Sequence, residues 1–416
     1  MIKEGGNVKV YLHSEALGKS YDGIIDKVKL PQLKREIAEA DVIVFDLNRV
    51  NEKTKNDLAL LNAFGLPHNS PSVFGAIADK LKKEGKQVVG SSAWTDQLEF
   101  DRNFGSVIAE RIGLSLPTTK RFRAVGEAQK FLNGNTDLWV LKPNNNADLD
   151  LTYVEKYPGE IFAKLMGDLK GRINGPFILQ EKVKGVECST EGFWDGEKWS
   201  GFNHTIESKR LMNSDLGPAI GSQSNTVWME SEPRIKKAFD KLSPMLQRVG
   251  YVGPIDVNAI YKDGKPYFLE WSPRYGYDAI YNTVELLDSS LYDFMSGNFS
   301  AARFKPGFSC SERVSIPPYP YDDKSLVDKY AKDIPVKCDM GNFYTLDVYR
   351  NGSLKCAGGD GIIGICARQG NSIGGAFGNV YRYIKDNVQI GSYLQYRTDA
   401  ARNHQKRFDK YYDQEA

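Results

Sequence analysis

The sequence has no long hydrophobic run, few cysteines and almost no net charge, and each deficit excludes a class of protein. Its 416 residues contain no apolar stretch near the roughly 20 residues that span a bilayer, and its N-terminus lacks the apolar core of a secretory signal. The five cysteines are odd in number and lack metal-ligand spacing. A net charge of +2 gives no electrostatic support for a nucleic-acid or membrane partner. We therefore expect a cytoplasmic protein whose thiols are buried or on the surface.

The composition is that of a soluble globular protein with more than one domain. Hydrophobic residues make up 41% of the chain and charged residues 26%, and the length allows two or three domains with real cores. From residue 1 to about 115, short apolar runs alternate with helical patterns, which predicts a small parallel sheet. From about Phe304 the chain becomes rich in proline and tyrosine and then continues as glycine-dotted strands.

The segment Gly253–Gly276 carries the most informative pattern. It alternates as two strands joined by an Asp-Gly turn, with Asp256 on the first strand and Glu270 and Ser272 on the second. Carboxylates that lie together on such a hairpin are the hard oxygen ligands that Mg²⁺ needs to bridge nucleotide phosphates. For the hairpin taken alone, an ordinary hairpin with solvated acids is an equally good reading.

The pairing of the two strands decides whether the two acids meet. A two-residue Asp-Gly turn pairs Asp256 with Trp271 and puts the acids on opposite faces. A three-residue loop that begins at Lys262 pairs Asp256 with Glu270 and puts them side by side. Only the second register allows the acids to share a cation.

Two further signals precede the hairpin in the sequence. Lys142 ends a predicted strand and can put its charge on a nucleotide's phosphates, although a strand-end lysine is usually just solvated. Phe177–Val183 is a predicted strand whose exposed edge could offer backbone groups to an adenine ring, with Glu187 placed for ribose hydroxyls. A common edge strand before a turn is the alternative. The order of the three signals is more informative than any one of them.

Four blocks of the sequence, in order across about Glu99–Ala401, resemble one family. Gln180–Ser189 (QEKVKGVECS) is similar to its EEfLxGxEaS, and Glu207–Gly221 (ESKRLMNSDLGPAIG) to its DhKRxxxxDxGPNTG. Phe268–Gly276 (FLEWSPRYG) is similar to its vlEfNvRFG, and Tyr393–Ala401 (YLQYRTDAA) to its yRxDIGxrA. The family is that of the phosphoribosylamine–glycine ligases, or glycinamide ribonucleotide synthetases, of the ATP-grasp superfamily.

The resemblance implies an ATP site. Lys142 and, more loosely, Arg102 would contact the phosphates of ATP, Glu181 and Val183 would meet the adenine at an interdomain hinge, and Glu187 would bind the ribose.

The resemblance also implies residues for the metal and for the reaction. Asp256, Glu270 and Ser272 would hold Mg²⁺, with Asp256 offsetting the replacement of the family's asparagine by Ser272. Arg274 would neutralise the transferring phosphoryl group or the acyl phosphate. On the acceptor side, the catalytic candidates are Lys209 and Arg210, and the substrate-binding candidates are Glu207, Asp215 and Gly217.

The chain departs from the family pattern at several glycine motifs. The family's GxGGREHA phosphate-binding turn is replaced by YLHSEALGKS near the N-terminus, and its C-terminal GGR by Gly358-Gly359-Asp360. Its glycine-rich lid loop is replaced by KPNNNADLDLTYV, which begins at Lys142, and its GPNTGG turn becomes Gly217–Ser222. The ATP half of the site is partly preserved, whereas the amine half is rewritten.

The implied architecture is an α/β and α+β multidomain protein with an ATP-grasp fold. An N-terminal α/β domain would cover 1–97, the ATP-grasp core 98–303 with a lid inserted at about 120–185, and a C-terminal α+β domain and tail 304–416. The lid would close over ATP and exclude water.

The implied activity is an ATP-dependent carboxylate–amine ligase that forms an amide through an acyl phosphate, with ATP and Mg²⁺. Its partners would be glycine or another amino acid and an amine, and it would act as a monomer or homodimer. Two alternatives stay open: a ligase repurposed for another amino acid and amine, including a modified nucleotide, and a non-catalytic nucleotide-binding relic. Retention of charges at Lys142, Glu187, Glu270 and Arg274 favours an active ligase, because packing alone does not require them.

Overall fold

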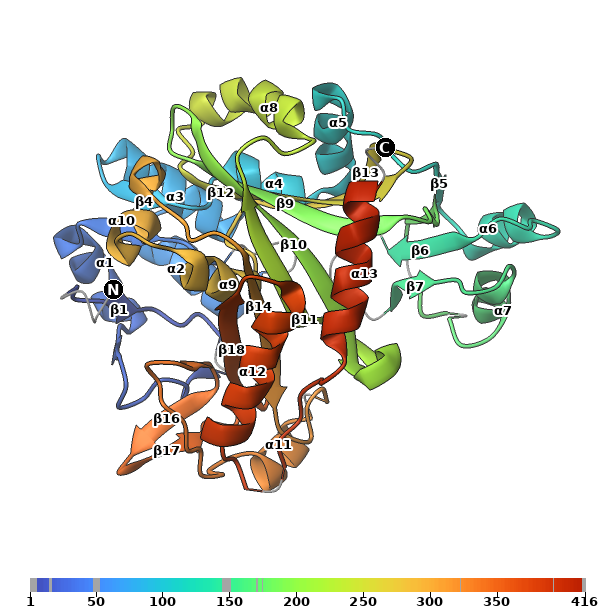
Figure 1. Cartoon of the computed structure of the whole chain (residues 1–416). Helices are drawn as coiled ribbons and strands as arrows, with labels where there is room; N and C mark the ends of the chain where they lie inside the picture. Colours follow the sequence, from blue (N-terminus) through green and yellow to red (C-terminus); the bar gives the residue numbers. More distant parts are fainter. Residues whose placement is uncertain are drawn as a thin grey trace.

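The computed structural model describes residues 6–14, 17–47, 53–143, 151–169, 171–173, 175–321, 323–391 and 393–413. Within these ranges the strands form an eight-stranded sheet, a four-stranded sheet and three separate pairs (Figure 1). In the same ranges, no helix combines the length and apolar character that a bilayer crossing requires.

The N-terminal region contains parallel strands, but they form two separate pairs rather than the single small sheet that the alternation of strands and helices predicts. Its two parallel pairs are β1 with β2 and β3 with β4. The element bounds are β1 Lys9–Val10, β2 Asp26–Lys27, α1 Leu30–Glu39, β3 Val42–Val44, α2 Lys55–Ala63, α3 Val73–Lys83 and β4 Gln87–Val89. Apolar residues of α2 and α3 form the core of this region together with Val88 of β4.

The eight-stranded sheet is antiparallel throughout, with the order β13-β12-β9-β10-β11-β14-β18-β15. Its strands are β9 Val186–Trp194, β10 Trp199–Met212, β11 Leu216–Glu230, β12 Gly253–Lys262, β13 Lys265–Ser272, β14 Phe308–Ser315, β15 Tyr344–Thr345 and β18 Ile362–Gly370. A short helix, η4 Asn213–Asp215, forms the turn between β10 and β11. The long β10–β11 hairpin crosses the middle of the molecule (Figure 1).

Helices cover this sheet and join its strands. They are α4 Ala93–Phe100, α5 Arg102–Ile112, α8 Lys236–Arg248, α9 Ala279–Leu286, α10 Leu291–Met295, α11 Lys324–Tyr330, α12 Ile373–Asn387 and α13 Ala400–Asp413, with the short helix η5 Phe299–Ala301. The strand pair β16 Val348–Asn351 and β17 Ser353–Cys356 lies in the C-terminal third of the chain.

The four-stranded sheet, with the order β5-β8-β6-β7, forms the unit at the right of Figure 1. Its elements are β5 Thr119–Phe122, α6 Val125–Leu132, β6 Trp139–Pro143, β7 Tyr153–Val154, α7 Glu160–Met166 and β8 Phe177–Glu181. It has its own core, which includes Phe122, Trp139, Leu141, Phe177 and Leu179. We call this unit the lid. Its predicted bounds, like the other domain bounds, stay predictions.

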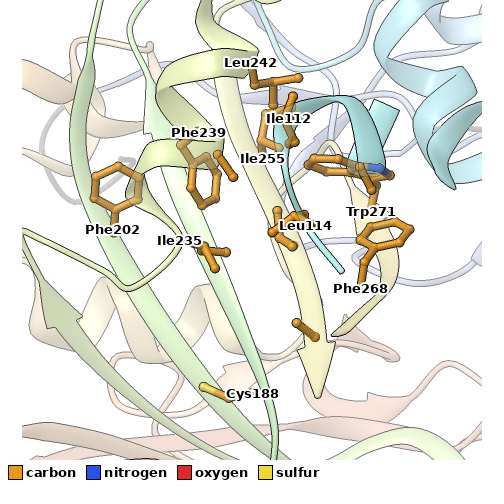
Figure 2. Packing of buried hydrophobic residues seen from close by; sticks show 14 of the residues in the cluster. Ile112, Leu114, Cys188, Phe202, Ile235, Phe239, Leu242, Ile255, Phe268 and Trp271 are labelled. Carbon is orange, nitrogen blue, oxygen red and sulfur yellow. The ribbon is translucent and has the colours of Figure 1, made fainter. Parts of the chain in front are cut away.

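One face of the large sheet is apolar because side chains alternate along its strands. Ile255 of β12 and Trp271 of β13 point into a cluster with Ile112 of α5 and with Phe239 and Leu242 of α8 (Figure 2). Every residue of this cluster is at least nine-tenths buried, so the cluster anchors α5 and α8 on that face. The intervening residues of the same strands therefore point to the opposite face.

Helix α5 lies close to β13 where the helix has a glycine. The indole nitrogen of Trp271 donates to the carbonyl oxygen of Gly105 at 2.9 Å. A Cβ at Gly105 would lie 2.4 Å from the carbonyl oxygen of Leu98 in α4, so a larger residue would push α5 away from α4. This contact fixes the start of α5, and with it Arg102, relative to the strand that carries Glu270.

The hairpin of β12 and β13 differs from both predicted registers. Lys262 pairs with Lys265 across a two-residue turn whose central residues both have positive φ. A bulge after Asn258 then shifts the register, so that Asp256 pairs with Ser272 and Asn258 with Glu270. Both predicted partners of Asp256 are therefore wrong. Asp256 and Glu270 nevertheless lie on the same face of the hairpin. The two-residue turn alone would put them on opposite faces, and the bulge shifts the pairing by one residue and brings them back to one face.

Candidate functional site

The polar face of the large sheet gathers acidic and amide side chains from four neighbouring strands. Glu191 of β9 pairs with Asp256 of β12 on one side and with Asn203 of β10 on the other. Ser189 pairs with Asn258 in the next same-face row of the ladder. Since paired residues share a face, these side chains lie together with Glu270 and Ser272 of β13.

Asp256 and Glu270 fit the role of metal ligands. The Oδ1 atom of Asp256 is buried and has no hydrogen-bond partner among the described residues. Burial raises the pKa of Asp256 well above its usual value, and the negative charges of Glu191, Glu207 and Glu270 add to this effect. A bound cation would supply the positive charge that this carboxylate lacks. The site residues thus fit Mg²⁺.

The described residues hold no complete metal cage. No group of three or more His, Cys, Asp or Glu side chains in this part of the chain is arranged to bind a metal ion. Protein Mg²⁺ sites in phosphoryl-transfer enzymes typically use one or two carboxylates and complete the octahedron with phosphates and water. Asp256 and Glu270 suit that kind of site, and Ser272 lies beside Asp256 in the ladder.

Two cationic side chains, one from the lid and one from α5, interact electrostatically with Glu270. Lys142 of β6 donates from Nζ to Oε1 of Gln180 at 2.8 Å. Burial lowers the pKa of Lys142 from 10.5 to about 8, although Glu270 acts to raise it. Burial also lowers the pKa of Arg102, again against the effect of Glu270. Both cations therefore lie within electrostatic reach of Glu270.

Glu187 and Lys209 form an ion pair on the same face. Nζ of Lys209 lies 2.6 Å from Oε1 of Glu187 and 3.9 Å from Oε2 of Glu207. Burial acts to raise the pKa of Glu187, but Lys209 holds it below its usual value. Burial raises the pKa of Glu207 to about 7, although Lys209 opposes the shift. Lys209 is thus fixed by acids at the point where the resemblance places the ribose.

Arg274 lies at the end of β13 and is held by an acid from α4. Its Nη2 atom lies 2.9 Å from Oε1 of Glu99, and its guanidinium stacks over the ring of Tyr277 at 3.9 Å. The backbone nitrogen of Gly276 donates to Glu191 at 3.2 Å. Glu191 is 3% exposed, and burial raises its pKa to about 7. These contacts fix the loop that carries Arg274.

The predicted adenine segment does not form a sheet edge. β8 lies between β5 and β6, so the prediction of an exposed edge strand is wrong. The backbone nitrogen of Glu181 donates to Thr118, and that of Lys182 to Leu138, each at 2.8 Å. Val183 follows the last of these contacts and is half-buried. The adenine contacts of Glu181 and Val183 stay predictions.

The other acceptor-side candidates lie at the turn end of the β10–β11 hairpin. Nη1 of Arg210 donates to the carbonyl oxygen of Gly217 at 2.7 Å. Asp215 accepts hydrogen bonds from Arg397 at 2.7 Å and from Asn403 at 3.3 Å. These contacts tie the turn to the C-terminal segment. The substrate contacts of Arg210, Asp215 and Gly217 stay predictions, and the predicted lid loop at 144–150 lies outside the described residues.

Sequence reasoning missed several residues of the site. Glu191 and Asn258 follow Glu187 and Asp256 at even spacings along their strands, so strand alternation was a usable signal for them. Glu99 lies 175 positions before its partner Arg274, and no local pattern indicates that pair.

The combination of the lid, the large antiparallel sheet and the polar face between them defines an ATP-grasp fold. The structure of phosphoribosylamine–glycine ligase from Thermotoga maritima superposes with a TM-score of 0.66 and 18% identity, covering 94% of this chain and all of that chain. The biotin carboxylase complex from Campylobacter jejuni superposes with a TM-score of 0.57 and 12% identity, covering 95% and 88%. The predicted fold class is confirmed.

In sequence, the chain is similar to curated phosphoribosylamine–glycine ligases. The enzyme of Methanosarcina barkeri is 22% identical over 266 residues, which are 58% of this chain and 59% of that protein. The enzyme of Thermococcus gammatolerans is 22% identical over 310 residues, 70% of each. The chain spans about half the length of the first relatives it matches. No protein-family model matches the sequence. The predicted resemblance is confirmed at low identity.

Proposed function

We propose that the protein is an ATP-dependent ligase that joins a carboxylate to an amine. The observation that carries this proposal is the arrangement of two acids and two cations, with Asp256 and Glu270 on the sheet and Lys142 and Arg102 within electrostatic reach of Glu270. Acids that hold Mg²⁺ and cations that contact phosphates are the requirements of phosphoryl transfer. The similarity to named ligases supports the same reaction.

Each residue then has a defined task. Asp256 and Glu270 would hold Mg²⁺, which supplies charge neutralisation on the phosphates of ATP. Lys142 and Arg102 would bind the phosphates, and Glu187 would bind the ribose. An oxygen of the substrate carboxylate attacks the terminal phosphorus, so ADP leaves and an acyl phosphate forms. Arg274 binds the transferring phosphoryl group.

The second step forms the amide. The amine nitrogen attacks the acyl carbon, the carbon–oxygen bond to phosphate breaks, and the nitrogen loses a proton. Water competes with the amine at this step, so the lid has to exclude it. The side chain of Arg121 on β5 donates to Asn103 of α5, which ties the lid to the core near Arg102.

The amine substrate is the part of the proposal that the sequence relatives leave open. Phosphoribosylamine with glycine is the pair that the names of the relatives give. One observation favours a different amine. The carboxylate of Asp347 accepts hydrogen bonds from the backbone nitrogens of Gly359, Asp360 and Gly361 at 2.7, 3.2 and 3.3 Å, and from the Ser20 hydroxyl at 2.9 Å. Asp347 thus joins the two segments that replace the family's glycine motifs. Its carboxylate occupies backbone nitrogens of the second segment, which are then not free to bind a phosphate of the amine substrate.

Release of ADP from MgATP tests the proposed function. The assay would offer glycine with phosphoribosylamine beside a panel of other amino acids and amines. ADP that forms only with glycine and phosphoribosylamine together would establish the activity of the named relatives. ADP that forms with another pair would identify a repurposed ligase and its substrates. No ADP with any pair, together with no MgATP binding in a calorimeter, would contradict the proposal.

Lys142 is expected to make ATP binding sensitive to pH. The protonated amine attracts phosphate, and its pKa of about 8 means that the charge is lost as the pH rises above that value. Because ATP already carries its full charge in this range, affinity for MgATP should fall about tenfold between pH 7 and pH 9. Lys142→Met should bind more weakly at pH 7 and show a flat profile, measured by calorimetry. A flat profile in the unchanged protein would remove Lys142 from the phosphate site.

A further inference from the structure

The C-terminal segment contacts the second half of β10 at several positions along the strand. Arg397, which is 1% exposed, donates to Asp215 at 2.7 Å and to the carbonyl oxygen of Arg210 at 3.3 Å. Both ring nitrogens of the buried His404 lie 2.8 Å from hydroxyls, one of Ser208 on β10 and one of Thr226 on β11. The helix α13 therefore runs along the sheet beside these strands (Figure 1).

Arg407 of the same helix connects β9 and β10 where they separate. Within the described residues, the pairing of the two strands ends at Thr205 and Ser189, although both strands continue. Beyond that point Arg407 donates from Nη1 to the carbonyl oxygen of Glu207 at 2.5 Å and from Nη2 to that of Glu187 at 2.7 Å. One planar guanidinium thus spans the gap with its two amino groups.

The side chains of the same two glutamates are held from the other face of the sheet. Lys209 contacts the carboxylate of Glu187 at 2.6 Å and that of Glu207 at 3.9 Å. Asn258 donates to Glu187 at 3.3 Å. Glu187 is therefore fixed twice, by Arg407 at its backbone and by Lys209 and Asn258 at its carboxylate. The backbone contact sets where the carboxylate can lie.

We propose that Arg407 is a positioning residue of the nucleotide site, which sets the spacing of β9 and β10 so that Glu187 meets the ribose of ATP. This inference rests on the proposed function, because Glu187 acts on ribose only if the protein binds ATP. The hydrogen bonds of Arg407 to the two strands are to backbone carbonyl oxygens, so its proposed role is to position Glu187 rather than to bind a ligand. Its positive charge also helps to keep the pKa of Glu187 low, so its loss weakens the ribose contact in two ways.

The decisive comparison uses a ligand with a ribose and a ligand without one. Arg407→Gln should weaken MgATP binding about tenfold in a calorimeter, because Glu187 shifts when the strands lose their bridge. Binding of Mg-tripolyphosphate should stay unchanged, since Lys142, Arg102 and Glu270 contact only phosphates and metal. If Arg407 had only a structural role, Arg407→Gln would bind both MgATP and Mg-tripolyphosphate more weakly, and that result would overturn the inference.

Two further variants complete the test. Lys406→Ala removes an exposed charge from the same helix and should bind both ligands as the unchanged protein does. Arg407→Lys keeps the positive charge but lacks the planar guanidinium that bridges two carbonyl oxygens. Its MgATP affinity should therefore lie between those of the unchanged protein and Arg407→Gln. It replaces the glutamine variant if that variant does not fold. Equal MgATP affinity in the unchanged protein and both Arg407 variants would overturn the inference alone. No MgATP binding by the unchanged protein would overturn the proposed function with it.

Discussion

Replacing Arg274 with alanine is expected to lower turnover about 10³-fold while MgATP affinity changes by less than about tenfold. An arginine that stabilises charge only in the transition state of phosphoryl transfer contributes on this scale. Glu99 at 2.9 Å and the ring of Tyr277 at 3.9 Å hold the guanidinium of Arg274 at the end of β13, and the proposed function assigns it this task. Steady-state ADP release and calorimetry measure the two effects separately.

The controls for Arg274 separate its charge from its structural contact. The single change leaves Glu99, which is 19% exposed, without this partner. The double variant Arg274→Ala with Glu99→Gln removes both charges, and it should stay as slow as the single variant if Arg274 acts on the reaction. Recovery of turnover in the double variant would instead assign the loss to Glu99. Arg303→Ala, at an exposed position, should be as active as the unchanged protein.

Strand alternation and the Asp-Gly turn were enough to predict the hairpin and its two acids, but not their pairing. The bulge after Asn258 moves Asp256 from Trp271 to Ser272. No glycine or proline lies at that bulge, so nothing local in the sequence indicates it. The packing of Trp271 against α5 requires the indole on the apolar face, and the register follows from that long-range constraint.

The contacts that position the site join residues that are far apart in the sequence. Arg407 and the carbonyl of Glu187 are 220 positions apart, and Arg397 and Asp215 are 182 apart. The sequence of the C-terminal tail gives no sign of these contacts, because the partners of α13 are backbone and side-chain atoms of strands that lie far away along the chain. Motif resemblance proposed residues that would face the ligands. It could not identify the residues that hold them in place.

Replacing Glu270 with glutamine is expected to lower Mg²⁺-dependent turnover about 10²–10³-fold. Glutamine keeps the shape of the side chain but loses the charge that a hard cation requires, and a metal contributes several kcal/mol to transition states of this kind. Glu270 is exposed at the surface of the sheet. The change should therefore leave the fold intact, which a thermal unfolding midpoint near that of the unchanged protein would verify.

A second effect of this variant distinguishes loss of the metal site from general damage to the nucleotide site. Glu270 acts on both Lys142 and Arg102 by its negative charge, so its removal leaves these cations with less competition for phosphate. Metal-free ATP should bind Glu270→Gln at least as tightly as it binds the unchanged protein, whereas added Mg²⁺ should no longer strengthen binding. Glu197→Gln, at an exposed turn, should keep the full Mg²⁺ response. Unchanged turnover in Glu270→Gln would remove Glu270 from the mechanism and leave Asp256 without a partner in the proposed metal site.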